Sequence, residues 1–108
     1  MFIIIKSSHL LGTSLKCYTC TASDSYYCLQ ASNRRVVECG NTVRGFRQLC
    51  SYIETYDSYR RLYNVEAGCQ LVGAADSTAT IQQKLCTKSI PVNKCKVCAT
   101  DYCNGYDY

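Results

Sequence analysis

The sequence predicts a small, disulfide-rich, all-β domain, and three observations carry that prediction. Ten of the 108 residues are cysteine. A short chain with more than about 8–10% cysteine is typical of a disulfide scaffold, and the even count lets every sulfur find a partner. Short runs of strand-forming residues alternate with polar turn residues. Large aliphatic side chains are sparse after residue 15, so we expect cross-links to supplement a modest core.

The first hairpin is predicted from two runs rich in strand-forming residues, Leu15–Cys20 and Arg34–Cys39. Residues 23–33 between them are turn-like. Gly40-Asn41 ends the second run, because both residue types interrupt a strand.

The second hairpin is predicted to be the longest in the chain. Its strands are Phe46–Tyr56 and Arg61–Cys69, in which successive side chains alternate between the two faces. Asp57-Ser58 is typical of the tight turn that joins such strands.

The remaining residues are predicted to hold one further short element. Residues 72–80 are small and polar and are interpreted as a loop or irregular turn. Ile81–Thr87 fits a short helix or a short strand, and the pattern does not separate the two. Ile90-Pro91 ends this element. The segment Cys95–Cys103 is interpreted as too rich in cysteine for a regular element of any length.

Disulfides persist in oxidising compartments, so we expect the chain to be exported. Residues 1–14 are interpreted as a degenerate signal peptide that leaves a domain of residues 15–108, since Gly12 and Ser14 suit cleavage before Leu15. The alternative is an ordinary polar extension. No hydrophobic tail follows the last cysteine. We therefore expect a secreted protein, or one held on the outer face of the plasma membrane by a GPI anchor if the chain was cut before such a tail.

Charge and composition argue against several classes of function. The net charge is only +4 and the basic residues are scattered, so a nucleic-acid partner is not expected. The single histidine, His9, lies in the predicted signal peptide, which leaves no imidazole base for a nucleophile. The sequence also has no glycine-rich phosphate loop. We therefore expect no catalysis, no cofactor and no small-molecule substrate.

A metal site is the main chemical alternative. The motifs Cys17-x2-Cys20 and Cys95-x2-Cys98 have the spacing of two halves of a zinc site. The other six cysteines, the lack of a histidine among them and the oxidising compartment argue against zinc. An intracellular zinc-binding protein therefore remains a second alternative, and the prediction is that no residue binds metal.

The positions of the cysteines predict a knot at one pole. Several cysteines lie at predicted strand ends, and three crowd the end of the chain at Cys95, Cys98 and Cys103. This distribution suits hairpins that extend away from a cross-linked base. The spacing alone does not define the pairing, because ten cysteines allow on the order of a thousand combinations.

Three motifs together resemble a known family. They are Leu15-Lys16-Cys17-Tyr18-Thr19-Cys20, Glu66-Ala67-Gly68-Cys69 and Cys98-Ala99-Thr100-Asp101-Tyr102-Cys103-Asn104. In this order, with ten cysteines, they resemble the three-finger domains of the lymphocyte-antigen-6 / urokinase-receptor (LU) family from Leu15 to Asn104. Lys96-Val97, between Cys95 and Cys98, resembles the invertebrate members. The resemblance implies an all-β, snake-toxin-like three-finger fold.

The resemblance also implies roles for individual residues. The disulfides it implies are Cys17–Cys50, Cys20–Cys28, Cys39–Cys69, Cys86–Cys95 and Cys98–Cys103. Asn104 would tie the C-terminal knot by side-chain hydrogen bonds to backbone, since its amide offers both donors and an acceptor. We expect Asp101 to be structural, with its carboxylate accepting nearby backbone N–H bonds in a tight turn.

Binding is the function class that remains, and the tip of the second hairpin is the candidate surface. The predicted partner-binding residues are Tyr56, Tyr59, Arg60 and Arg61. Tyrosine and arginine are enriched in interaction hot spots. The alternative is that tyrosines such as Tyr52 and Tyr63 are cross-strand packing partners in a thin sheet.

The resemblance implies recognition of a membrane protein through the finger tips. Such a partner is a receptor or an ion channel, for example one that controls neuronal excitability. An alternative of another class is a structural or adhesion protein of epithelial cell junctions. Contact with the membrane itself is expected only if the chain carries a lipid anchor.

Overall fold

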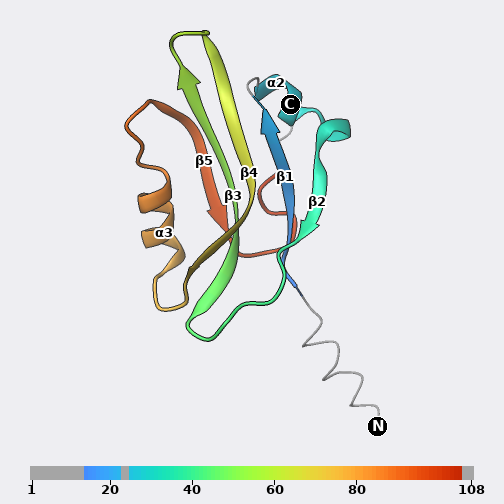
Figure 1. The fold of residues 1–108 in the computed structure, drawn as a ribbon, viewed down its shortest axis with the longest axis vertical. Helices are drawn as coiled ribbons and strands as arrows, with labels where there is room; N and C mark the ends of the chain where they lie inside the picture. The colour runs from blue at the N-terminus through green and yellow to red at the C-terminus, as the bar shows by residue number, and fades with distance from the viewer. Residues whose placement is uncertain (1–13, 23–24, 106–108) are drawn as a thin grey trace.

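The computed structural model describes residues 14–22 and 25–105, and its central feature is one five-stranded antiparallel sheet (Figure 1). The predicted signal peptide falls almost entirely outside the described residues. The five strands follow the order β2-β1-β4-β3-β5. In chain order the elements are β1 (Lys16–Ala22), α2 (Ser25–Leu29), a 3₁₀ turn (Ala31–Asn33), β2 (Arg35–Glu38), β3 (Phe46–Asp57), β4 (Leu62–Gly73), α3 (Thr78–Leu85) and β5 (Val92–Cys98). The prediction of a mostly β, disulfide-rich domain is confirmed, with two short α-helices added.

Both predicted hairpins are present. β1 pairs with β2 in antiparallel register, and β3 pairs with β4 along the full twelve residues of each strand. The β3–β4 hairpin projects beyond α2 and β5 in Figure 1. β1 also pairs with β4, so the two hairpins join into a single sheet.

The helices occupy segments for which the sequence predicted a turn or left the structure open. Helix α2 and the 3₁₀ turn occupy part of the segment expected to be a turn between β1 and β2. β4 continues to Gly73 and α3 begins at Thr78, so the loop predicted over residues 72–80 is present but is limited to residues 74–77. The side chain of Ser77 accepts a hydrogen bond from the backbone N–H of Thr80, which satisfies one of the free donors of the first turn. This cap starts the helix, and Ile81 then anchors it on the sheet.

Strand β5 is the clearest correction to the sequence prediction, because the first part of the cysteine-rich segment, from Cys95 to Cys98, lies in a regular strand. It pairs with β3, placing Cys95 opposite Ile53 and Cys98 opposite Cys50. Residues three apart on a strand point to opposite faces. The two cysteines therefore bond on different sides of the sheet, and their density does not oppose a strand.

Two small cores lie on the two faces of the sheet. The alternation of β3 sends Leu49 to one face and Tyr52 to the other. Leu49 packs with residues of α3 and β5, namely Ile81 and Val97. Tyr52 packs with buried residues of β1, α2 and β4, namely Cys20, Cys28, Leu29 and Val65. Each helix therefore covers one apolar patch of a thin sheet.

A β-bulge supports a buried carboxylate in the middle of β3. Glu54 is only 2% exposed. The register between β3 and β5 shifts at Glu54 and Thr55, so Asn93 has no position of its own in the ladder. Its amide donates a hydrogen bond to one carboxylate oxygen of Glu54, and the hydroxyl of Tyr52 donates to the other at 3.3 Å. The bulge therefore supplies a hydrogen-bond donor to the buried carboxylate.

Candidate functional site

The tip of the β3–β4 hairpin is a turn organised by Asp57. Its Oδ1 atom accepts hydrogen bonds from the backbone N–H groups of Tyr59 at 3.0 Å and Arg60 at 3.2 Å. Its backbone carbonyl accepts from the N–H of Arg61 at 2.7 Å. Arg61 has a φ of 58°, a left-handed conformation that is uncommon for a residue with a side chain. These bonds fix the backbone on which the tip side chains stand.

The predicted partner-binding residues occupy different environments at this tip. The side chain of Tyr59 is 97% exposed, and Arg61 is also exposed. The guanidinium of Arg60 forms an ion pair with Asp57, with 2.9 Å between Nε and Oδ2, and donates to the side-chain oxygen of Asn64 at 3.3 Å. Tyr59 is therefore the large aromatic side chain that the tip offers to solvent, while Arg60, though exposed, is bonded to the turn.

Tyrosine packing accounts for the base of the tip. Tyr56 and Tyr63 are register partners on β3 and β4, and their ring centroids lie 5.1 Å apart with tilted planes. Tyr52 is buried in the core beside α2. Tyr52 and Tyr63 thus pack between strands, as the alternative interpretation expected. Tyr56, which was predicted to bind a partner, also packs in this way.

The carboxyl pKa of Asp57 is lowered from its ordinary value of 3.8, chiefly by the side-chain hydrogen bond from Arg60 and then by the backbone N–H groups of Arg60 and Tyr59. A group with a lowered folded-state pKa stabilises the fold above its unfolded pKa, and the contribution is lost as pH falls through the lowered value. We expect the turn to lose this support below about pH 4.

NMR titration of the Asp57 carboxyl carbon tests this account. Arg60→Ala is expected to move the pKa back toward 3.8, because it removes the strongest donor. Asn64→Ala is the matched control, since it removes the other contact of Arg60 and leaves the bonds to Asp57 in place. An unchanged titration in Arg60→Ala would contradict the assignment of the donor.

Asn104 joins the C-terminal turn to two strands. This side chain is 1% exposed. Its Nδ2 group donates to the backbone carbonyl of Tyr18 on β1 at 2.9 Å and to that of Ser51 on β3 at 2.7 Å. Its Oδ1 atom accepts from the N–H of Tyr18 at 2.9 Å. One amide therefore satisfies three backbone groups of two neighbouring hairpins.

Asp101 also contacts backbone, but its donor is remote in sequence. The carboxylate accepts a hydrogen bond from the N–H of Lys16 at 2.9 Å. The sequence led us to expect a donor within the same tight turn. The difference arises because the C-terminal turn lies alongside β1, where the N–H of Tyr102 also donates to the carbonyl of Lys16.

All ten cysteines form disulfides, and three of the bonds are neighbours across the sheet. The pairs are Cys17–Cys50, Cys20–Cys28, Cys39–Cys69, Cys86–Cys95 and Cys98–Cys103. These are the pairs that the resemblance implies. Cys50 lies in register with Cys69 on β4 and with Cys98 on β5. The bonds of these three cysteines form a row that ties β1, the end of β2 and the C-terminal turn to the centre of the sheet.

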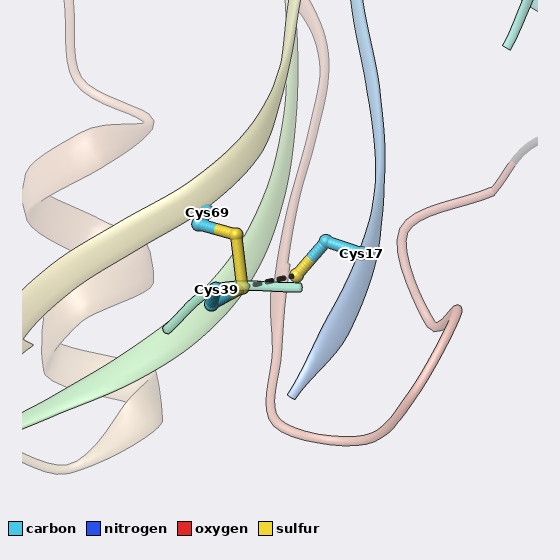
Figure 2. A group of neighbouring side chains, drawn as sticks. All are labelled: Cys17, Cys39 and Cys69. Atoms are coloured by element: carbon cyan, nitrogen blue, oxygen red, sulfur yellow. Dashed lines mark hydrogen bonds between the residues drawn. A yellow bond between two sulfur atoms is a disulfide. The ribbon is translucent and has the colours of Figure 1, made fainter. Parts of the chain in front are cut away.

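The sulfur atoms of Cys17, Cys39 and Cys69 form a tight group in which they lie within 4.8 Å of one another (Figure 2). Metal ions bind the cysteine thiolate, whereas each of these sulfurs is in a disulfide bond. The four cysteines of the two Cys-x2-Cys motifs likewise belong to four different disulfides. In this structure they are not two halves of a zinc site.

A pocket on one face of the sheet was not anticipated from the sequence. It has a volume of about 610 Å³. Residues of three strands and of the segment between α3 and β5 line it, including Thr21, Ile53, Thr55, Glu66, Lys88 and Ile90. The register places Glu66 opposite both Thr21 and Ile53. Local patterning carries no information on this long-range register, so no signal in the sequence indicated the pocket.

Comparisons with known proteins return no relative. No family model matches the chain, and no curated protein or solved structure matches it. Within the described residues, none of the helices has the length and apolar character required to cross a membrane. The inference of function therefore depends on the chain's own residues.

Proposed function

We propose that the chain is a non-enzymatic extracellular binding module with a three-finger fold, and that it recognises a membrane receptor or ion channel. Two antiparallel hairpins and the α3–β5 segment extend from a row of three disulfides, and this arrangement supports the proposed fold. Five disulfides in so short a chain support an oxidising compartment. The chain then acts as a secreted protein, or as one anchored by lipid to the outer face of the plasma membrane.

The exposure of Tyr59 on an ordered turn is the observation that carries this proposal. A tyrosine offers a large apolar area and a hydroxyl group at low entropic cost. A turn that is already ordered reduces the entropy lost when a partner binds. Asp57 and Arg60 supply that order through the bonds described above. The tip therefore combines a projecting aromatic side chain with a prepared backbone.

Tyr59→Ala is expected to weaken binding by about 10-fold or more, because this is the effect of truncating a hot-spot side chain. Because Tyr59 contacts solvent in the free protein, we expect the melting temperature of the variant to change by no more than about 4 °C. To identify the partner, a fluorescent tetramer of the full chain is screened against cells that each express one receptor or channel. Titration of the purified variants on those cells then measures the loss.

Leu71→Ala is the matched control, because Leu71 is 56% exposed and lies near the opposite end of the same hairpin. We expect it to bind as the parent does. If Tyr59→Ala and the parent bind the partner with equal affinity, the proposed role of the tip is contradicted. A screen without any binding partner would argue against recognition of a membrane protein.

A further inference from the structure

Two disulfides touch each other beside the centre of the sheet. The Sγ atoms of Cys17 and Cys39 lie 3.3 Å apart, although each is bonded to a different cysteine (Figure 2). Neither sulfur carries a hydrogen, so the dashed line in Figure 2 marks a non-bonded contact. The partners of these two residues, Cys50 and Cys69, lie directly opposite each other on β3 and β4. The contact and the register thus bring together a second complete pairing, Cys17 with Cys39 and Cys50 with Cys69.

We propose that the Cys39–Cys69 bond is a site of attack by small thiols, and that the attack starts an exchange which re-pairs all four cysteines. The bonds Cys17–Cys50 and Cys39–Cys69 become Cys17–Cys39 and Cys50–Cys69. Disulfide exchange proceeds when a thiolate attacks a disulfide sulfur through a mixed disulfide. The contact between two disulfides supplies the geometry for such a relay inside the folded protein.

The exchange takes three steps, and the thiol is regenerated. A small thiolate attacks Cys69 Sγ, forms a mixed disulfide and releases Cys39 as a thiolate. Cys39 attacks the neighbouring Cys17 Sγ, forms Cys17–Cys39 and releases the thiolate of Cys50. Cys50 then attacks Cys69, forms Cys50–Cys69 and expels the small thiolate. Each step forms one S–S bond and breaks one, so there is no net oxidation or reduction.

Accessibility selects the bond at which the exchange begins. Cys17 and Cys50 are each 0% exposed, which shields their bond from a thiol in solution. Cys39 and Cys69 are partly exposed. The last step is also reasonable in geometry, since opposite residues on antiparallel strands have Cα atoms about 4.5–5.5 Å apart, a separation that a disulfide spans.

The re-pairing changes what the bonds hold together. In the structure, Cys17–Cys50 links β1 to β3, and Cys39–Cys69 links the residue after β2 to β4. The new pairs would each lie within one hairpin, Cys17–Cys39 in β1–β2 and Cys50–Cys69 in β3–β4. The first hairpin would then be held to the central hairpin without these two covalent links. Thiols would in this way loosen one finger from the other.

The test on the parent chain is a disulfide map after treatment with reduced glutathione. The reaction is run near pH 8.5, where about half of a typical cysteine thiol is ionised, quenched with acid and digested without reduction. Cross-linked peptides joining Cys17 to Cys39 and Cys50 to Cys69 are expected in equal amounts, with Cys86–Cys95 unchanged. Native pairs alone, or glutathione on Cys69 with Cys17–Cys50 intact, would overturn the proposal.

A trapping experiment tests exchange across the same Cys17–Cys39 contact in the opposite direction. Cys50→Ser leaves Cys17 as a buried thiol in contact with Cys39. Exchange would transfer the free thiol to Cys69, which is partly exposed, and iodoacetamide would capture it there. Label on Cys69 together with a Cys17–Cys39 peptide is expected. Label on Cys17, or no label, would contradict the relay.

Cys28→Ser is the matched control for the trap. It leaves Cys20 as a buried thiol, and Cys20 is not part of the group of three close sulfurs in the described residues. The free thiol is expected to stay at Cys20, with the other four disulfides unchanged. Movement of label to another cysteine in this control would show exchange without the contact and would overturn the assignment.

Discussion

Asn104→Ala is expected to destabilise the fold by about 3–5 kcal/mol. The substitution removes the partner of two carbonyl groups and one N–H group on Tyr18 and Ser51. A buried polar group left without a partner costs about 1–3 kcal/mol. For a domain of this size the melting temperature should fall by on the order of 15 °C or more. Calorimetry with the disulfides intact measures the change.

Asn33→Ala separates this effect from the loss of any asparagine side chain. Asn33 donates to the carbonyl of Tyr27 in an exposed position, where water replaces the lost bond. Its expected cost is therefore below about 1 kcal/mol. Similar losses in the Asn33 and Asn104 variants would mean that the buried amide does not hold the hairpins together.

Removal of the Cys17–Cys50 bond is expected to cost about 4 kcal/mol. The bond closes a separation of 33 residues, and in the chain-entropy account the stabilisation grows with the length of the closed loop. The double variant Cys20→Ala/Cys28→Ala is the comparison, because that bond closes only 8 residues. Its expected cost is about 2.5 kcal/mol. Guanidinium unfolding of Cys17→Ala/Cys50→Ala and of Cys20→Ala/Cys28→Ala measures the two losses in unfolding free energy. A larger loss of stability for the variant that opens the short loop would contradict this account.

The parts of the fold that local patterning determines were predictable. Alternating residues and the Asp57-Ser58 turn led to the β3–β4 hairpin, and β3 has almost the expected ends, whereas β4 continues past the predicted end at Cys69 to Gly73. Helix α3 was predicted less well, because its start depends on the cap at Ser77 rather than on apolar periodicity. Strand β5 was missed because cysteine density was taken as evidence against a strand, whereas alternation places Cys95 and Cys98 on opposite faces.

The candidate site divides in the same way. The tip could be predicted because its residues are close in sequence, and Asp57 organises neighbours only two to four positions away. The donor to Asp101 could not be predicted, because Lys16 lies 85 positions earlier. The pocket and the contact between Cys17 and Cys39 likewise depend on which strands become neighbours. Such proximity follows from tertiary packing, about which short-range patterns carry little information.

The hydrogen bonds of Asn104 have a consequence for the order of events during synthesis. Ribosomes make a chain from its N-terminus, so Tyr18 and Ser51 emerge 86 and 53 residues before the amide that binds them. Until then, both hairpins can form by themselves, but three of their backbone groups depend on water. The two hairpins of the nascent protein are thus fully joined only when the turn that carries Asn104 has been made.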